Sequence, residues 1–425
     1  MQIEALYKIY QAYPSVQTDT RKLKKDDLYF ALKGPHFNGN LFAQQALDAG
    51  AAYVITDEPT GTEPAKTVQV PDVLTALQAL AKFHRQQFTI PFIAITGSNG
   101  KTTTKELVHE VLSSTFITYT TEGNLNNHIG IPLTILKVKA DAEMAVVEMG
   151  ANHQKEIESY CSYTLPTHGL ITNCGKAHLE GFGGVEGVKK GKGELFDFLR
   201  ASKGTAFIMQ DYSYLQEMSN GIPHIFTYGT ANAGVTGKIT GETGFLNVEI
   251  FEGASTGTIH THLVGEYNLP NVLAAVAIGK YFSVDDHTIK QAIESYQPSN
   301  SRSQLITKDN NRFILDAYNA NPTSMKAAIE NFAKMEGSNK ILMLGGMMEL
   351  GEESIPEHEA IVRLIDSYPW KNVVLVGGDY NQFNHAYTYL NNSAEAKEWL
   401  AELNPADALV LVKGSRSMKM ERVLE

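Results

Sequence analysis

The residues that most clearly predict chemistry are two glycines, a lysine and a threonine, spaced as Gly97-x-x-Gly100-Lys101-Thr102. Residues 91–95 before them have the composition of a buried parallel strand, and the residues from Lys101 onward have helical composition. Such a turn surrounds an anion with backbone N–H groups and the positive end of a helix dipole. Lys101 can then reach the β- and γ-phosphates of a nucleotide, and the Thr102 hydroxyl can bind Mg²⁺. The spacing therefore predicts a nucleoside triphosphate site.

The alternative is that this turn simply ends a strand. The longer glycine spacing of such loops is absent, because Ile95 stands where its first glycine would be. The strand before the turn, the helix after it and the three threonines at 102–104 favour phosphate binding.

Two further side chains follow predicted strands, at the edge where open parallel sheets bind their ligands. Glu148 stands near the end of the predicted strand 144–149, and His178 follows the predicted strand 169–173. A carboxylate at this edge, near Lys101 and Thr102 in space, could hold Mg²⁺. An isolated histidine is more often structural than catalytic, so both roles stay open for His178 at this point.

Other polar residues have a plain structural explanation beside a functional one. They are Asn124, Asn126 and Asn127, Lys189, Lys190 and Lys192, and His260 and His262. The asparagines are typical of an Asx-rich turn, the lysines of a solvated helix start, and the histidines of a solvent-facing strand surface. Residues 20–21 and the polar loop 33–40 either connect elements or carry binding groups.

The composition is that of an ordinary globular protein. Of the 425 residues, 43% are hydrophobic and 20% are charged, and the net charge is -11. This acidic balance argues against general binding to nucleic acid or membrane surfaces. No apolar run reaches the ~18 residues of a membrane span, and residues 1–14 lack the order of a signal peptide, so we expect a cytoplasmic protein. Cys161 and Cys174, the only cysteines, are expected as reduced thiols in or near a core.

The length predicts about three domains, since roughly 150 residues are typical of one. We place them at residues 1–88, 89–299 and 300–425. The first is a small α/β domain. The second is a parallel-sheet domain with the phosphate loop, an antiparallel extension over residues 245–264 and a buried helix over residues 268–282. The third alternates strands and helices, which predicts a Rossmann-like doubly wound sheet, so the fold class is α/β.

Taken together, the motifs resemble the Mur ligase family. The matching segments run in the family's order across all three predicted domains. They are TGSNGKTTTKE (96–106), EGNLNNHIGIPLT (122–134), VVEMGA (146–151), TNCGKAHLEGFG (172–183), KGELF (192–196), NSR (300–302), DAYNANP (316–322), MMELG (347–351) and KGSRSMKME (413–421). The phosphate loop alone would indicate only a nucleotide-binding protein.

The resemblance implies an ATP-dependent, ADP-forming amide ligase. The YNANP and NNHIGIP segments favour the family activity that joins D-alanyl-D-alanine to UDP-N-acetylmuramoyl-tripeptide in cytoplasmic peptidoglycan precursor synthesis. In this chemistry the γ-phosphate moves to the tripeptide carboxylate, and the dipeptide amine attacks the resulting acyl phosphate. Lys101 and two Mg²⁺ ions would neutralise the charge. The implied partners are these small molecules, without nucleic acid or membrane insertion, and we expect a monomer.

The resemblance also implies roles for individual residues. Lys101, Glu148, His178 and Lys192 would be catalytic. Thr102 and Glu148 would hold one Mg²⁺, and His178 and a carbamate formed on Lys192 would hold the second. The ATP contacts would come from Gly97, Ser98, Asn99, Gly100, Lys101, Thr102, Thr103, Asn268, Asn271, Arg302 and Asp316. Contacts to the UDP-linked and peptide substrates would come from Thr20, Arg21, Lys33, Asn38, Asn126, Asn127, Tyr318, Asn319, Asn321 and Arg416. Arg302 is expected near the phosphates, and Arg416 near the peptide.

Three rival interpretations remain. The first is another ligase of the superfamily, either the enzyme that adds the third amino acid or a folylpolyglutamate synthetase, but the C-terminal part lacks the Asp-Asn-Pro-Arg segment of the former. The second is a regulatory P-loop switch, which leaves His178 and Lys192 unexplained. The third is an inactive binding homologue, which is disfavoured because every proposed catalytic position is filled.

Overall fold

The computed structural model describes residues 2–241, 244–299 and 301–425. The chain forms two compact units. The first comprises the described residues up to 95, with residues 116–150 and 156–169. The second comprises the described residues of 96–115, 151–155 and 170–425.

The N-terminal part of the first unit is a small parallel sheet. Its strands are β1 (Val16–Gln17), β2 (Leu28–Phe30), β5 (Tyr53–Thr56) and β6 (Thr67–Gln69), hydrogen-bonded in that order. A small core of Tyr29, Ala31, Ala43, Ala46 and Val54 packs between this sheet and α2. The other elements here are α1 (Ile3–Ala12), η1 (Thr20–Lys22), β3 (Lys33–Gly34), β4 (Phe37–Asn38), η2 (Gly39–Phe42), α2 (Ala43–Asp48), η3 (Pro64–Lys66) and α3 (Val73–Arg85).

Helix α3 links this small sheet to the rest of the first unit. Asp72 caps its start by accepting a hydrogen bond from Thr75 N at 2.7 Å. At its end the buried Arg85 donates to the carbonyls of Thr164 and Leu165, at 2.9 and 3.0 Å. These carbonyls end helix α6 (Glu156–Thr164), so a buried cation stabilises the negative end of that helix.

The central sheet has nine strands, in the order β15-β14-β13-β12-β11-β10-β7-β9-β8. The first unit holds β7 (Phe92–Thr96) up to Ile95, β8 (Thr118–Thr120) and β9 (Met144–Glu148), and these three strands are parallel. The remaining strands are β10 (His168–Ile171), β11 (Thr205–Met209), β12 (His224–Gly229), β13 (Val235–Thr240), β14 (Phe245–Glu252) and β15 (Gly257–Val264). Pairing becomes antiparallel from β13 to β15, which confirms the predicted extension.

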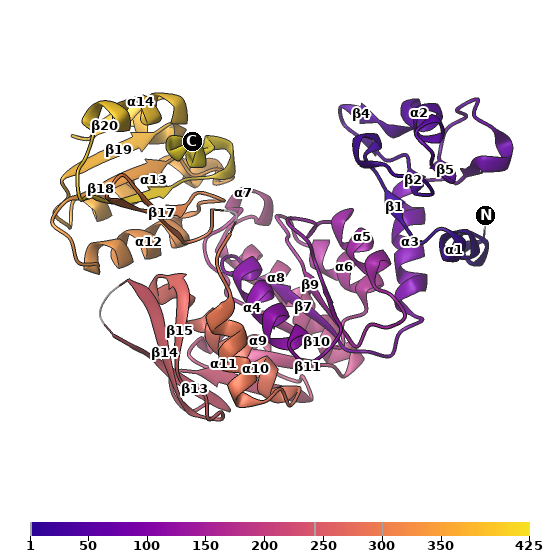
Figure 1. The fold of residues 1–425 in the computed structure, drawn as a ribbon, viewed down its shortest axis with the longest axis horizontal. Coiled ribbons are helices and arrows are strands. Elements are labelled where there is room, and N and C mark those ends of the chain that lie inside the picture. Colours follow the sequence, from indigo (N-terminus) through magenta and orange to yellow (C-terminus); the bar gives the residue numbers. More distant parts are fainter. Residues whose placement is uncertain (1, 242–243, 300) are drawn as a thin grey trace. The chain divides into compact units, whose positions relative to one another are not determined.

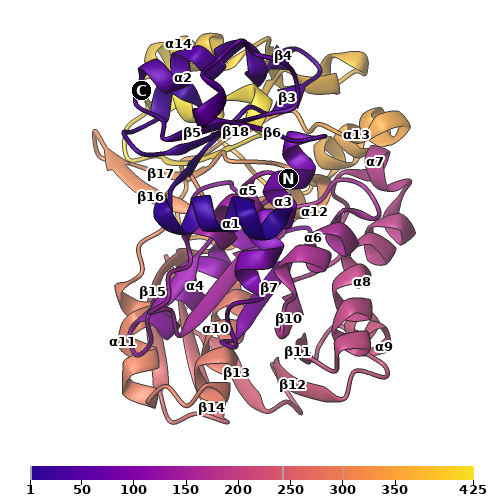
Figure 2. The ribbon, with the colours of Figure 1, turned by 90° about the vertical axis from the view of Figure 1, so that its right-hand side faces the viewer.

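Several helices accompany this sheet along the chain. They are α4 (Lys101–Ser113), α5 (Gly130–Lys137), α6, α7 (Leu179–Phe182), α8 (Val185–Ser202), α9 (Ser213–Met218), α10 (Leu269–Tyr281) and α11 (Asp286–Ser295), with η4 (Glu266–Asn268) before α10. Residues 271–279 of α10 are all buried, as the apolar sequence predicted, and α10 packs against α4 (Figure 1). Helices α8 and α9 pack against β11 (Figure 2). The glycine-interrupted segment is helical already from Val185. A Cβ atom on Gly191 would lie 2.5 Å from Phe182 Cε1, so glycine is needed for this ring to pack against α8.

The C-terminal part of the second unit is a six-stranded sheet in the order β16-β17-β21-β18-β19-β20. Its strands are β16 (Gln304–Lys308), β17 (Asn311–Asp316), β18 (Lys340–Gly345), β19 (Asn372–Val376), β20 (Thr388–Leu390) and β21 (Leu409–Lys413). Pairing is parallel except between β16 and β17, so the predicted doubly wound sheet carries one antiparallel edge strand. Its helices are α12 (Pro322–Lys334), α13 (Ser354–Ile365) and α14 (Ser393–Leu403), with η5 (Gly351–Glu353), η6 (Gly378–Gln382), η7 (Arg416–Met418) and η8 (Met420–Leu424).

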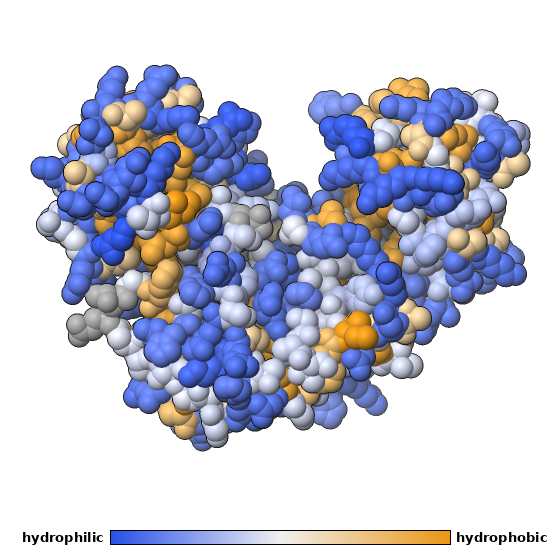
Figure 3. Space-filling view, in the orientation of Figure 1, coloured by the Kyte–Doolittle hydropathy of each residue, from blue (hydrophilic) through white to orange (hydrophobic). Residues whose placement is uncertain are grey.

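Surface and cysteine chemistry follow the expectations from composition. Both cysteines are buried free thiols, and burial raises the pKa of Cys174 to about 12. Hydrophilic residues dominate the face drawn in Figure 3, with apolar residues in smaller patches. Among the described helices, none combines the length and apolar character needed to cross a membrane.

Candidate active site

Both glycines of the phosphate loop are required by their conformation and by close neighbours. Gly97 and Gly100 have φ values of 143° and 80°. A Cβ atom on Gly97 would lie 1.9 Å from Thr172 Oγ1, and one on Gly100 would lie 2.6 Å from Asn271 Oδ1. No side chain fits at either position, so glycine is needed for the loop to pack this closely against Thr172 and Asn271. The turn joins β7 directly to α4, as the sequence predicted.

The segment after β10 holds this loop in place. Ser98 N donates to Asn173 O at 2.8 Å, and Asn99 N donates to Asn173 Oδ1 at 3.1 Å. The Thr172 hydroxyl donates to Asn99 O at 2.6 Å. Sequence analysis gave Thr172 and Asn173 no role, although both lie in the TNCGKAH segment. The signal in the sequence is their position at the carboxyl end of a predicted strand, the same edge of the sheet that predicts roles for Glu148 and His178.

Lys101 and Thr102 stand at the start of α4. The Lys101 amine donates to Gly97 O at 2.7 Å and to Ser98 O at 3.2 Å, so it lies along its own loop. Thr102 is buried and Thr103 half-buried. The positive end of the α4 dipole therefore coincides with the lysine amine, which suits an anion.

Asn268 and Asn271 connect α10 to the phosphate loop. Asn271 Nδ2 donates to Asn268 Oδ1 at 2.8 Å, and Asn268 Nδ2 donates to Val264 O at 2.9 Å. The Thr104 hydroxyl of α4 donates to Asn271 Oδ1 at 3.0 Å. The two asparagines predicted near adenine are thus buried, with Asn271 directly against Gly100.

Glu148 is buried in the first unit at the end of β9, in register with Ile95 of β7. Asn126 Nδ2 donates to Glu148 Oε1 at 2.7 Å. Glu148 Oε2 is also buried and has no hydrogen-bond partner among the described residues. A buried carboxylate oxygen without a donor is costly, so this atom is suited to a cation or a donor from a ligand.

Asn127 differs from its neighbour Asn126. Its Oδ1 accepts hydrogen bonds from Ile129 N at 3.1 Å and from Gly130 N at 2.9 Å, where α5 begins. Asn127 therefore forms the Asx-type turn that was the alternative to a binding role.

Lys192 is buried in α8 and has 1% relative exposure. Its amine donates to Ala151 O at 2.9 Å and lies 4.9 Å from the centroid of the Phe182 ring. Its neighbours behave as the solvated helix start predicts, since Lys189 pairs with Glu186 at 2.7 Å and Lys190 is exposed. Of the three lysines at positions 189, 190 and 192, the one that the family resemblance singled out is the buried one.

His178 bonds through Nδ1 to the carboxylate of Glu349, in the loop after β18. Both residues have positive φ, 53° for His178 and 61° for Glu349. Non-glycine residues in this conformation are uncommon and concentrate at functional sites. The bond to His178 lowers the pKa of Glu349. When Nδ1 is the donor, the other ring nitrogen has the lone pair that binds a metal. The sequence alone gave no reason to pair these two residues.

The described residues contain no cluster of three or more His, Cys, Asp or Glu side chains that could hold a metal ion. The predicted Mg²⁺ ligands, Thr102 and Glu148, stay predictions, and Mg²⁺ at phosphate sites uses few protein ligands. The unpartnered Oε2 of Glu148 fits such an ion.

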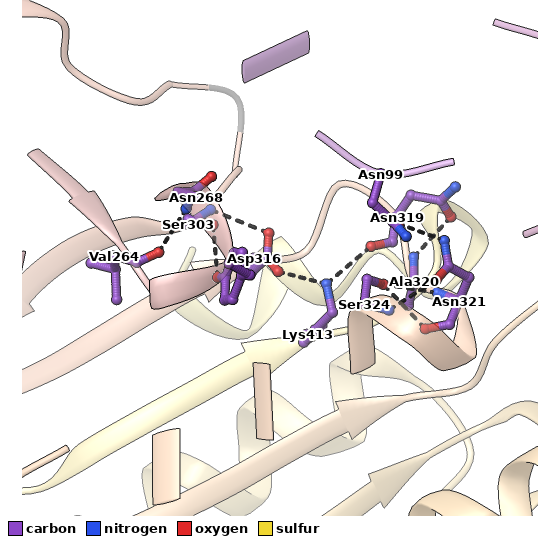
Figure 4. A network of polar contacts seen from close by, with 11 residues as sticks. Asn99, Val264, Asn268, Ser303, Asp316, Asn319, Ala320, Asn321, Ser324 and Lys413 are labelled. Atoms are coloured by element: carbon purple, nitrogen blue, oxygen red, sulfur yellow. Dashed lines mark hydrogen bonds and ion pairs between the residues drawn. The ribbon is translucent and has the colours of Figure 1, made fainter. Parts of the chain in front are cut away.

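The loop 316–322 after β17 lies in a network of polar contacts (Figure 4). Asp316 accepts from Ser303 N at 3.2 Å and from the Lys413 amine at 2.5 Å. The Lys413 amine also donates to Asn319 O at 3.3 Å. Asn321 Nδ2 donates to Asn99 Oδ1 at 2.7 Å, so the peptide loop predicted from YNANP contacts the phosphate loop directly.

Tyr318 in this loop lies beside two arginines. The guanidinium carbon of Arg302 is 3.6 Å from the Tyr318 ring centroid, and that of Arg416 is 5.4 Å from it. The three candidate residues come from three separate segments of the second unit.

The N-terminal candidates lie in the first unit. Lys33 pairs with Glu58 at 3.1 Å, and Asn38 Nδ2 donates to Glu58 at 3.0 Å, so these two side chains converge on one carboxylate. Thr20 and Arg21 begin a 3₁₀ helix, and Arg21 pairs with Asp19, which lowers the pKa of Asp19 to about 2.

Comparison with known proteins assigns the family. The "Mur ligase family, catalytic domain" matches residues 13–86, the "Mur ligase middle domain" residues 95–279, and the "Mur ligase, glutamate ligase domain" residues 301–416. The UDP-N-acetylmuramoyl-tripeptide--D-alanyl-D-alanine ligase of Bacillus subtilis (strain 168) is 33% identical, over 96% of this chain and 92% of that protein. The chain belongs to the Mur ligase family.

Solved Mur ligases have the same fold. A crystal structure of MurF from Acinetobacter baumannii matches with a TM-score of 0.87 at 30% identity, covering 98% of this chain and 97% of the other. MurF ligase from Thermotoga maritima in complex with ADP matches with a TM-score of 0.84 at 25% identity, covering 96% of both chains. These findings confirm the predicted α/β fold class of this Mur ligase. The roles of its individual residues and its domain limits stay predictions.

Proposed function

We propose that this Mur ligase joins D-alanyl-D-alanine to UDP-N-acetylmuramoyl-tripeptide in peptidoglycan precursor synthesis, converting ATP to ADP and phosphate. The observation that carries the proposal is the similarity, over nearly the whole chain, to a ligase named for this reaction. The phosphate loop, with glycines that leave no room for a side chain, supports the nucleotide part of the proposal.

The reaction requires activation because a carboxylate is a poor electrophile. An oxygen of the tripeptide carboxylate bonds to the γ-phosphorus of ATP, and the bond between that phosphorus and the β–γ bridging oxygen breaks. The amine of D-alanyl-D-alanine then attacks the acyl carbon, loses a proton, and phosphate leaves. Lys101, the loop N–H groups and the α4 dipole would stabilise the charge that develops on the phosphoryl oxygens.

Two Mg²⁺ ions would neutralise phosphate charge and align the reacting groups. Thr102 and Glu148 are the proposed ligands of one ion, and His178 and Lys192, the latter as a carbamate, are those of the other. The buried position of Lys192 and the engagement of His178 Nδ1 by Glu349 support these roles. We include a cytoplasmic location and a monomeric state in the proposal, as the sequence predicted.

The proposal is tested by ADP release from the purified protein with ATP, Mg²⁺ and UDP-muramoyl-tripeptide. We expect release to depend on D-alanyl-D-alanine, and Lys101→Ala to lower turnover by at least about 100-fold. ADP release that is indifferent to the dipeptide would support a nucleotide switch instead. Ligation of a single diamino acid to the muramoyl-dipeptide would identify a different ligase of the superfamily.

A further inference from the structure

Glu349 binds the ring of His178, one of the two proposed ligands of the second Mg²⁺ ion. It lies in the loop between β18 and η5, and its carboxylate bonds to His178 Nδ1. An ionised carboxylate only accepts hydrogen bonds, so the proton is on Nδ1. Within the described residues no hydrogen bond engages the other ring nitrogen, Nε2, and the His178 side chain keeps 23% exposure. The carboxylate therefore fixes the ring in an orientation that leaves Nε2 open.

The backbone of the same loop also contacts the segment that carries His178. Glu180 N donates to Glu349 O at 3.3 Å, and a Cβ atom on Gly351 would lie 3.3 Å from Glu180 Cβ. His178 and Glu349 both have left-handed backbone conformations, which cost energy in residues other than glycine. Such conformations persist only where surrounding contacts fix them, so the pairing of these two residues is set by the packing of both segments.

A buried histidine fixes the loop that presents Glu349. Met347 and Leu350, on either side of it, are 1% and 2% exposed. Met347 N donates to His358 Nε2 at 3.0 Å, and His358 Nδ1 donates to Ser354 O at 2.7 Å. The His358 ring is therefore neutral, in agreement with burial, which lowers its pKa. Glu349 thus extends from a well-anchored loop, although its own side chain is 52% exposed.

The segment 176–180 is bound by two further residues of the C-terminal part of the second unit. Lys176 N donates to Thr323 Oγ1 at 2.9 Å, near the start of α12, and the Lys176 amine pairs with Glu357 of α13. Glu349 therefore acts on a segment whose backbone is already held by other neighbours. What its carboxylate adds is control of the His178 side chain.

Helix α7 joins His178 to the other proposed ligand, Lys192. Phe182 N donates to His178 O at 3.1 Å, which closes the single turn of α7. The Phe182 ring packs against α8, with its centroid 4.9 Å from the Lys192 amine. The backbone at residue 178 is thus held relative to Lys192, and the direction of the His178 ring decides whether both side chains can bind one ion.

We propose that Glu349 is a positioning residue of the second metal site, which orients His178 so that Nε2 binds the ion. This inference rests on the proposed function, because that function requires the ion, and it adds a residue to it. A carboxylate bonded to a metal-binding histidine also makes the ring a stronger ligand. Loss of the carboxylate frees the ring to rotate and to carry its proton on Nε2, the nitrogen that the ion needs.

The test observes the metal directly, with Mn²⁺ in place of Mg²⁺ and with bicarbonate and a non-hydrolysable ATP analogue present. Pulsed EPR on protein with isotope-labelled histidine detects the coupling between Mn²⁺ and a bound imidazole nitrogen. We expect this coupling in the wild type and its loss in His178→Ala. Glu349→Ala should lose most of the coupling and weaken Mn²⁺ binding by about 10- to 100-fold. Glu349→Gln, whose amide oxygen still accepts from Nδ1, should keep most of both.

The matched control is Glu352→Ala, which removes an exposed carboxylate three residues later, in η5. It should keep the coupling, the Mn²⁺ affinity and the affinity for the ATP analogue. Coupling of wild-type strength in Glu349→Ala overturns the inference, and so does a wild type without the coupling. An equal loss of affinity for the ATP analogue in Glu349→Ala also overturns it, because a general disturbance of the site then explains the result.

ADP release, measured on the same proteins with and without D-alanyl-D-alanine, tests the proposed function separately. Release that is indifferent to the dipeptide overturns that function, whereas the imidazole coupling in Glu349→Ala decides the inference.

Discussion

The side-chain nitrogen of Asn321 lies 2.7 Å from the side-chain oxygen of Asn99, and the oxygen of the same Asn321 accepts from Ser324 N at 2.9 Å. One amide therefore caps α12 and binds the phosphate loop at the same time. The Asn321 side chain therefore joins the loop after β17 to the phosphate loop.

Replacing Asn321 separates these two contacts. Asn321→Ser keeps a good N-cap but is too short to reach Asn99, whereas Asn321→Ala loses both contacts. We expect the alanine variant alone to lose about 1 kcal/mol of unfolding free energy, measured with urea. Both variants should lower kcat/KM for ATP by about 2- to 10-fold, the size of one neutral hydrogen bond. A kcat/KM for ATP equal to that of the wild type in Asn321→Ser would show that the contact with Asn99 does not contribute to activity.

Gly100→Ala should weaken nucleotide binding. The new methyl group would lie 2.6 Å from Asn271 Oδ1 on a backbone with φ of 80°. We expect ATP affinity, measured calorimetrically, to fall by at least about tenfold, with a loss of stability above about 1 kcal/mol. Gly61→Ala is the matched control, because Gly61 has φ of 67° but no atom within 4 Å of the new methyl group. It should show the backbone strain alone, and an equal loss of stability in both variants would exclude the collision with Asn271.

Lys192→Ala should lower the turnover of the enzyme, and added short carboxylates should partly restore it. If Lys192 acts as a carbamate, short carboxylates such as acetate or formate can occupy the space left by the side chain and supply the missing oxygen ligand. We therefore expect turnover to fall by about 100-fold or more and to recover partly with added carboxylate. Lys190→Ala, which removes an exposed lysine two residues earlier, should do neither. Full activity of Lys192→Ala without added acid would refute the role.

Partial burial lowers the pKa of His168 to about 4, against about 6.5 in an unfolded chain. Between these values the unfolded state binds more protons, so the folded state loses stability as the pH falls from 6.5 to 4, and the loss is complete below 4. The full contribution is up to about 3 kcal/mol. His168→Gln removes it, so the variant should gain stability relative to wild type between pH 7 and pH 4.5 in urea unfolding. Burial lowers the pKa of His84 and His358 as well, but both are retained in the variant. Parallel pH profiles of the two proteins would contradict the assignment.

Local sequence patterns predicted many of the helices and strands. They could not predict contacts between residues that are far apart in the sequence. The turn from β7 to Lys101, the antiparallel strands β14 and β15 and the buried helix α10 are each encoded within a few consecutive residues. The edge strand β16 was missed because residues 304–308 alternate weakly and are partly exposed. The contact of Asn321 with Asn99 joins residues 222 positions apart, and no spacing rule predicts it.

The candidate site likewise has a part that the sequence predicts and a part that depends on packing between distant segments. Sequence motifs identified the candidate site residues Lys101, Glu148, His178 and Lys192. Only the family resemblance indicated that Lys192 differs from its exposed neighbours, and the structure shows it buried. The partner of His178, Glu349, lies in a quoted motif, but its role depends on how the loop after β18 approaches residue 178. That approach is a property of packing between distant segments.

Residues 271–279 of α10 are all buried, so the packed neighbours leave this helix no room to shift. Asn271 at its start is therefore a rigid wall of the nucleotide pocket that we propose at Gly100. Inhibitors that add bulk against this wall should be rejected by shape, whatever their charge.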